Sequence, residues 1–507
     1  MCDNSSAWRF ILKNSTKNFG FKHKSGILMP VSSLPSPYGI GSFGKGAFDF
    51  VDFLAETEQK CWQVLPLNPT SYGDSPYQSP ASAAGNPYFI DLDLLAEDGL
   101  LTAAELKEVK FKARRVDYGR IYFTRYEILR TAFSRFKKNA AYISFCSKNA
   151  HWLDDYALFM ALKVKNGWKA WVEWEENEKV ARIARKNAEK YEDESGFWKW
   201  IQFEFFTQWG NVRKYAKEKG VVIVGDIPIY VAHDSVDVWA SPANFMLDDD
   251  YYPTEVAGCP PDAYAEDGQL WGNPIYDWRK MEREGFAWWI ERVGCAFALY
   301  DILRIDHFRG FASYFSIPYG DKNARGGEWR DAPGIKLFEA IKEAIPSAKI
   351  IAEDLGFITE DVRELLAETG FPGMKVLQFA FYGEDNEYLP RMYDTDNCVV
   401  YSGSHDSDCT SSWCKSLKGA NKKIFLRECP TVEGQTPTEA VIALAMSSRA
   451  NLCIIPMQDY LELTNAKGRM NTPSVAEGNW QWRVPDGYAT EELKAKITNM
   501  TRKWLRA

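Results

Sequence analysis

Short apolar runs recur along the chain, and each ends in polar or charged residues that are usually followed by a segment with helical periodicity. The runs are rich in Val, Ile and Leu and span residues 26–31, 61–67, 221–231, 298–307, 349–354, 375–381, 398–402 and 452–457. Such runs, separated by helices, are typical of parallel strands that are buried on both faces. The pattern therefore predicts a succession of βα units.

The number of runs is close to the eight strands of a (β/α)₈ TIM barrel, which is the fold we predict. A bare barrel needs about 250 residues, so a chain of 507 residues must carry large insertions. We expect an N-terminal extension over 1–25 and a single barrel over 26–507. Within it we expect a mainly helical insertion at about 92–194 and a loop insertion at about 232–277. An open doubly wound sheet is the alternative, but no Gly-rich phosphate fingerprint follows any run.

Composition excludes several classes of protein. The formal net charge of −8 argues against a nucleic-acid partner, and no run approaches the ~20 apolar residues of a membrane span. Ten scattered cysteines without a CxxC pair favour reduced thiols in the cytoplasm over disulfides or zinc. The N-terminus lacks the apolar core of a secretion signal. Organellar import stays open, because Asp3 is the only acidic residue before Asp49.

Barrel enzymes carry their active sites at the C-terminal ends of the strands, so polar residues that end the apolar runs are the candidates. Asp306, in LRIDHFRGF, shares a strand face with Arg304 because side chains alternate along a strand. A neighbouring guanidinium keeps a carboxylate ionised, as a nucleophile requires. A structural ion pair at a strand end explains the spacing equally well.

Two further runs end in carboxylates. Glu353, in IIAEDLG, has apolar neighbours that raise the pKa of a carboxylic acid, as a general acid needs, although it could instead start a helix, as could Asp354. His405 and Asp406, in SGSHDSD, would hold substrate hydroxyls or form a solvated turn. We expect no metal there, because no third ligand lies nearby.

Three carboxylates at three predicted strand ends fit glycoside chemistry. One acid protonates the leaving oxygen, and a second carboxylate attacks the anomeric carbon. The chain also contains 19 Trp, 25 Tyr and 30 Phe, and some of these aromatics sit in loops with Asn, Asp and Gly, a setting that suits a sugar ring. Serine-hydrolase, phosphate-loop and dinucleotide fingerprints are absent.

At these residues the chain resembles the amylomaltase (disproportionating enzyme) family of the α-amylase clan. The resemblance is carried by RIDHFRGF, AEDLG and the HD turn, and it extends over roughly residues 26 to 485. Further matching segments are SSLPSPYGIGSFG, GDSPYQSPASAAGNPYFIDL, GDIPIYVAHDSVDVW, GCPPDAYAEDGQLWGNPIYDW, PGMKVLQFAF and RMNTPSVAEGNWQWR. The resemblance implies a 4-alpha-glucanotransferase that moves segments of α-1,4-glucan to a 4-hydroxyl of glucose or a glucan by retaining double displacement, without a cofactor.

The resemblance also implies roles for single residues. Asp306 would be the nucleophile, Glu353 the acid/base and Asp406 the third carboxylate. The implied substrate-binding residues are Arg304, His405, Asp226, Tyr72 and Trp271. The insertion at 232–277 would contact the substrate, with α-1,4-glucan and maltooligosaccharides as partners and glucose as an acceptor.

Two positions depart from the family pattern. Ser407 stands where the motif THDNDT has an Asn, and Ser474 stands where a Gly is expected, which would stiffen that loop. Two alternatives remain at this point: a hydrolase of the same clan, with water as the acceptor, and an inactive glycan-binding protein. The intact set of three carboxylates argues against the second.

Overall fold

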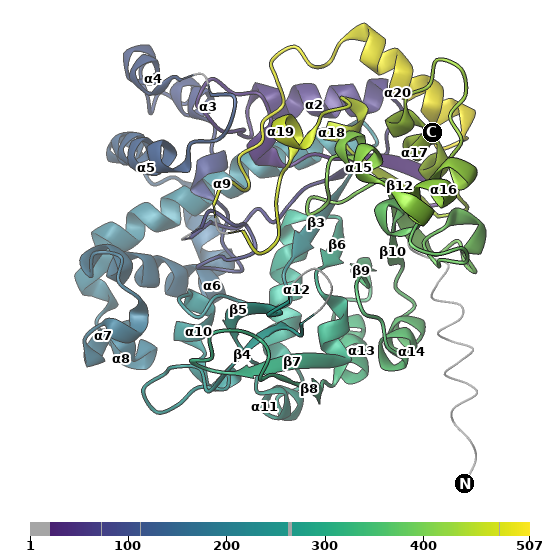
Figure 1. Ribbon diagram of the computed structural model, residues 1–507. Coiled ribbons are helices and arrows are strands. Elements are labelled where there is room, and N and C mark those ends of the chain that lie inside the picture. The colour runs from purple at the N-terminus through teal and green to yellow at the C-terminus, as the bar shows by residue number, and fades with distance from the viewer. Residues whose placement is uncertain (1–20, 72, 112, 262–265, 476) are drawn as a thin grey trace.

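The computed structural model describes residues 21–71, 73–111, 113–261, 266–475 and 477–507. Eight parallel strands of this described part form the central sheet, in the order β10-β11-β12-β1-β2-β3-β6-β9 (Figure 1). The two end strands also meet, because the Ala352 N–H donates to the Pro372 carbonyl, directly before β10, at 3.0 Å. The sheet is thus wrapped into a barrel, and the (β/α)₈ prediction is confirmed. The strands are β1 (Lys24–Leu28), β2 (Cys61–Gln63), β3 (Val222–Ile227), β6 (Ile302–Ile305), β9 (Ile350–Ala352), β10 (Gly373–Val376), β11 (Cys398–Tyr401) and β12 (Leu452–Pro456).

Each predicted run overlaps one of these strands, but the bounds differ. The clearest difference is in the run at 375–381, where β10 already ends at Val376 because a 3₁₀ turn, η8 (Leu377–Phe379), follows. At the other end of the chain β1 begins at Lys24, inside the expected extension, since the Lys24 N–H donates to the Asn451 carbonyl at 2.9 Å. Residues 1–20 lie outside the described part.

The register of the strands decides which side chains meet. Asp226 on β3 is paired with Arg304 on β6, and Ile305 is paired with Ala352 on β9. Residues side by side in parallel strands point to the same face. Asp226 and Arg304 are therefore adjacent inside the barrel. Asp306 follows Ile305 and Glu353 follows Ala352, so both carboxylates lie at the same end of the barrel.

Helices surround the barrel, with their apolar faces against the strands. The longest, α9, extends beyond the barrel. Its C-terminal part packs on β3 and α2, and the helix also packs against α5 and α6. The helices of this layer are α2 (Lys45–Glu56), α9 (Glu192–Glu218), α12 (Ala287–Leu299), α13 (Gly334–Ala344), α14 (Glu360–Thr369), α17 (Pro437–Ser447) and α20 (Glu491–Lys503). Among the described helices, none is both long and apolar enough to cross a membrane.

Between residues 92 and 191 the chain is helical and lies to one side of the barrel (Figure 1). Polar caps start these helices: Asp91, Asp117 and Asn139 accept backbone N–H groups, and Thr102 forms a capping box with Glu105. The elements are α3 (Leu92–Glu97), α4 (Ala103–Val109), α5 (Tyr118–Arg135), α6 (Ala140–Lys165), α7 (Glu176–Lys179) and α8 (Ala181–Lys186). Short helices elsewhere are α10 (Val236–Ala240), α11 (Trp278–Arg283), α15 (Thr410–Ser416), α16 (Gly419–Glu428), α18 (Met457–Tyr460) and α19 (Asn465–Gly468).

The stretch at 232–277, expected as a loop, contains two strands. They belong to a separate antiparallel sheet in the order β5-β4-β7-β8, formed by β4 (Glu255–Cys259), β5 (Gln269–Pro274), β7 (Ser313–Pro318) and β8 (Glu328–Asp331). The register shifts between Val256 and Gly258, and a Cβ at Gly258 would lie 2.1 Å from the Gln269 carbonyl oxygen. An irregular ladder of this kind, rich in Gly and Pro, hides the alternating pattern by which strands are recognised.

The buried guanidinium of Arg506 ties the two ends of the described chain together. It has no exposed surface. Its N–H groups donate to the carbonyls of Met446 at 2.6 Å, Ser448 at 2.7 Å, Ala450 at 3.0 Å and Lys24 at 3.1 Å. These bonds connect Arg506 to the end of α17, to the loop before β12 and to the first barrel strand.

We expect Arg506→Leu to lower the free energy of unfolding by about 3 kcal/mol, because buried carbonyls would lose their donors. Urea denaturation followed by circular dichroism measures the effect. The control is Arg502→Leu, four residues earlier, whose ion pair with Glu58 is exposed and should contribute less than about 1 kcal/mol. Equal losses in both variants would contradict the role given to Arg506.

Candidate active site

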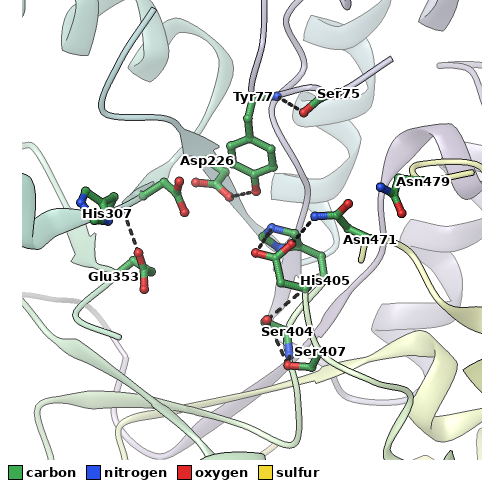
Figure 2. A network of polar contacts seen from close by, with 12 residues as sticks. Ser75, Tyr77, Asp226, His307, Glu353, Ser404, His405, Ser407, Asn471 and Asn479 are labelled. Carbon is green, nitrogen blue, oxygen red and sulfur yellow. Dashed lines mark hydrogen bonds and ion pairs between the residues drawn. The ribbon is translucent and has the colours of Figure 1, made fainter. Parts of the chain in front are cut away.

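The three candidate carboxylates come together at the C-terminal end of the barrel. Asp306 directly follows β6, Glu353 directly follows β9, and Asp406 lies in the turn after β11. Asp306 and Asp406 line one cavity of about 280 Å³. The Glu353 carboxylate accepts the backbone N–H of His307 at 2.6 Å, which places it beside the residue after Asp306 (Figure 2).

Arg304 lies between two carboxylates beneath this cavity. Its Nη1 donates to Asp226 Oδ2 at 2.6 Å and its Nη2 to Asp306 Oδ1 at 2.9 Å. Asp226 Oδ2 also accepts the Tyr77 hydroxyl at 2.7 Å (Figure 2). Arg304 is buried and Asp226 has no exposed surface, so both lie behind the cavity wall and act on it through Asp306 and Tyr77.

The surroundings separate the pKa values of Asp306 and Glu353. Burial raises the pKa of Asp306 to about 6, and Arg304 opposes the rise. Burial also raises the pKa of Glu353, to well above its ordinary value, and the neighbouring Asp306 charge raises it further. Asp306 therefore ionises first as pH rises, and over a range of pH it is a carboxylate beside a protonated Glu353. This is the division of roles between nucleophile and acid that glycoside chemistry needs.

His405 and Asn471 hold the third carboxylate. His405 Nε2 lies 3.3 Å from Asp406 Oδ2, and the Asn471 side-chain amide donates to Asp406 Oδ1 at 2.6 Å. Burial raises the pKa of Asp406, but the charge and hydrogen bond of His405 and the bond from Asn471 outweigh it and keep the pKa well below its usual range. Among the described residues no group of three or more His, Cys, Asp or Glu could hold a metal ion.

Aromatic side chains form the walls of the cavity. The Tyr77 ring is stacked on His405, with centroids 5.2 Å apart and planes at 17°, and Trp480 packs against both rings. Trp271 also lines the cavity, edge-on to His307 at 4.8 Å. Tyr72, the other aromatic residue expected here, lies outside the described residues.

Sequence reasoning missed three of these side chains. Tyr77 stands in the same YGDSPYQ segment as Tyr72, and residue type alone does not separate the two. Asn471 and Trp480 stand in RMNTPSVAEGNWQWR, a segment that was noticed only as part of the resemblance. The signal available in each case was an aromatic or amide residue in a loop rich in Pro, Gly and Asn.

The two departures from the family pattern affect turns at the cavity. The Ser407 hydroxyl oxygen accepts the Ser404 N–H at 2.9 Å, which closes the turn that carries Asp406. Ser474 has a φ of +65° and lines the cavity. The Val475 N–H donates to the Thr472 carbonyl at 3.2 Å, so Ser474 takes the third position of a β-turn after Pro473, where glycine is favoured.

A family model described as 4-alpha-glucanotransferase matches residues 29–490. The chain belongs to the 4-alpha-glucanotransferase family. A 4-alpha-glucanotransferase of Clostridium butyricum is 47% identical over 94% of this chain and 99% of its own length. A chloroplastic/amyloplastic 4-alpha-glucanotransferase of Solanum tuberosum is 40% identical over 94% of this chain and 85% of its own.

A solved structure, described as amylomaltase from Streptococcus agalactiae in complex with acarbose, is 39% identical. It covers 96% of this chain and 100% of its own, with a TM-score of 0.92. The resemblance seen in the motifs and the activity it implied, 4-alpha-glucan transfer, are thereby confirmed. The hydrolase and the inactive binding protein are not favoured.

We expect a bell-shaped dependence of kcat/KM on pH. Below a pKa of about 6 Asp306 becomes protonated and activity falls, about tenfold per pH unit well below that value. Above the raised pKa of Glu353 the acid is lost and activity falls again. Initial rates on maltotriose across pH measure both limbs. A profile that stays flat through pH values well below 6 would contradict the ionisation order.

Proposed function

We propose that the enzyme transfers segments of α-1,4-glucan to the 4-hydroxyl of glucose or of a second glucan, by double displacement with retention at the anomeric carbon. The observation that carries this mechanism is that Asp306 and Glu353 follow neighbouring strands, with Glu353 bonded to the N–H of the residue after Asp306 and with its pKa raised further above its ordinary value by the Asp306 charge. Retaining enzymes need the two carboxyl groups about 5–5.5 Å apart. The contact between Glu353 and the His307 N–H supports that short separation rather than the longer one of inverting enzymes.

In the first step an Asp306 oxygen attacks the anomeric carbon and the glycosidic C–O bond breaks. Glu353 gives its proton to the leaving oxygen, so the shortened glucan departs with a free 4-hydroxyl. Arg304 keeps the Asp306 carboxylate in position through its 2.9 Å hydrogen bond to Oδ1. The product is a glycosyl ester on Asp306 and an ionised Glu353.

We assign Asp406 and His405 to the binding of the sugar that reacts. Asp406 has a lowered pKa and is oriented by Asn471, so it can accept hydrogen bonds from hydroxyl groups of that sugar and stabilise the positive charge that develops on it. The ring of Tyr77, stacked on His405, offers an apolar face to the same sugar. We assign Asp226 a positioning role, since its bonds are to Tyr77 and Arg304.

In the second step Glu353 takes the proton of an acceptor 4-hydroxyl as that oxygen attacks the anomeric carbon, and the bond between this carbon and Asp306 breaks, which frees the Asp306 carboxylate. Water competes for the ester, so transfer needs an acceptor that is positioned and water that is excluded. We assign this role to the insertion that carries Trp271, whose indole packs edge-on against His307 and donates to the Gln269 side chain at 3.1 Å.

No disulfide joins the described cysteines, which supports a reducing compartment such as the cytoplasm.

We expect maltotriose to yield glucose together with longer maltooligosaccharides while total reducing ends stay nearly constant, because each transfer makes one glycosidic bond for each that it breaks. Chromatography of the products and a reducing-end assay measure both quantities. Reducing ends that rise in step with bond cleavage would identify a hydrolase instead.

We expect Trp271→Ala to slow transfer and to raise the hydrolytic share of turnover several-fold, since the acceptor would lose its aromatic contact. The same two assays measure this share. The matched control is Trp329→Ala, which removes an exposed indole from the same antiparallel sheet. An unchanged ratio of transfer to hydrolysis in Trp271→Ala would remove this role.

We expect Glu353→Ala to lose far more activity, about 10²-fold or more, on maltotriose than on an aryl glucoside with an activated leaving group, which departs without protonation. Asp306→Asn should instead lose activity on both substrates and form no covalent glycosyl-enzyme detectable by mass spectrometry. Equal losses of Glu353→Ala on the two substrates would exclude it as the acid.

A further inference from the structure

Two exposed tyrosines lie together outside the cavity, at one end of the antiparallel sheet. Tyr252 precedes β4 and Tyr319 follows β7, strands that pair side by side (Figure 1). Their ring centroids are 6.2 Å apart and the planes are tilted by 31°. Tyr252 is 36% exposed and Tyr319 51%. The two rings therefore present a shallow, nearly continuous aromatic surface to solvent.

The surrounding backbone holds this surface in place. The Asp248 carboxylate accepts the Tyr252 N–H at 2.9 Å, and the Asp248 N–H donates to the Tyr252 carbonyl at 2.8 Å. The Tyr319 N–H donates to the Thr254 carbonyl at 3.1 Å. Tyr251 has a φ of +69°, which is rare for a bulky residue. The backbone that carries both rings is thus already fixed before a ligand binds, so little backbone entropy is lost on binding.

The chemistry around the rings favours a neutral, hydroxyl-rich ligand. Asp248, Asp249 and Asp250 are exposed beside Tyr252. Carboxylates accept hydrogen bonds from hydroxyl groups and repel anions, so nucleic acids and acidic glycans are disfavoured. A pyranose ring combines an apolar C–H face with hydroxyls at its edge, which matches aromatic faces flanked by carboxylates.

The surface is connected to the cavity through the sheet. Trp271, which lines the cavity, lies on β5, and β5 pairs with β4, the strand beside β7. Pro274, three residues along β5, is paired with Val256 near the end of the sheet that carries both tyrosines. Strand rise and spacing put the rings on the order of 15 Å from Trp271. A chain longer than the cavity could contact both places.

We propose that Tyr252 and Tyr319 form a second binding surface for α-1,4-glucan, one that holds a remote part of a long chain whose end reacts at Asp306. The inference rests on the proposed function, because the ligand is its substrate. A short substrate such as maltotriose fills the cavity alone and gains nothing from the tyrosine surface. Long chains gain a second contact at a high effective concentration, so their apparent affinity rises.

The experiment compares Tyr252→Ala/Tyr319→Ala, the ring-preserving Tyr252→Phe/Tyr319→Phe and Leu426→Ala, a control that removes an exposed side chain from α16. Electrophoresis of the full-length protein in gels containing amylopectin measures affinity, and maltotriose disproportionation measures the cavity alone. The double alanine variant should bind amylopectin about tenfold more weakly, with unchanged maltotriose turnover and unfolding temperature. The double phenylalanine variant should keep most of the affinity, and Leu426→Ala all of it.

Unchanged amylopectin affinity in the double alanine variant would overturn the proposal while normal maltotriose transfer leaves the proposed function standing. Failure of the wild-type protein on maltotriose would instead overturn the proposed function. Sedimentation tests a second copy of the chain as the occupant: a dimer that dissociates on the alanine substitutions, without loss of amylopectin affinity, would assign the rings to self-association. If the double alanine variant is unstable, Tyr319→Ser alone should still lose affinity about threefold.

Discussion

The ion pairs of Arg304 are the interaction on which the rest of the site depends. One buried guanidinium forms ion pairs with two carboxylates, Asp226 and Asp306. Breaking such a buried pair typically costs about 3–5 kcal/mol, because a charge is left without a partner. The arrangement joins β3 to β6 and, through Tyr77, the loop that follows β2. Asp306, the proposed nucleophile, is therefore held by residues of the barrel strands.

Two carboxyl groups of similar intrinsic acidity acquire different roles from their surroundings. Asp306 is stabilised as an anion by Arg304, whereas Glu353 has burial and the Asp306 charge against its ionisation. The backbone N–H of His307 orients Glu353 without removing that effect. Asp406 differs from both, because His405 and Asn471 keep its pKa well below its usual range. The proposed roles of nucleophile, acid and stabilising anion thus follow from partners and burial.

The barrel and the inserted segments contribute different parts of the candidate site. The candidate carboxylates follow the barrel strands. The aromatic walls of the cavity come from added segments: Tyr77 from the loop after β2, Trp271 from the antiparallel sheet and Trp480 from the chain after β12. Loops at the C-terminal end of a barrel can vary without disturbing the strands. The antiparallel sheet extends beyond the cavity and carries the tyrosine surface that we propose as a second contact for a long glucan.

Much of this protein was readable from sequence, because its signals are local. Apolar runs ending in charged residues predicted the barrel strands, and Asp306, Glu353 and Asp406 were recognisable as candidates from the strand ends they follow. Residues such as Tyr77 and Asn471 were not, since their partners Asp226 and Asp406 lie far away in the sequence. Nor was the antiparallel sheet, whose strands come from two segments with irregular pairing. Sequence alone determined which chemical groups stand at the strand ends. Only the tertiary structure decided which of them are buried, paired and therefore charged, because burial and pairing depend on contacts between distant segments.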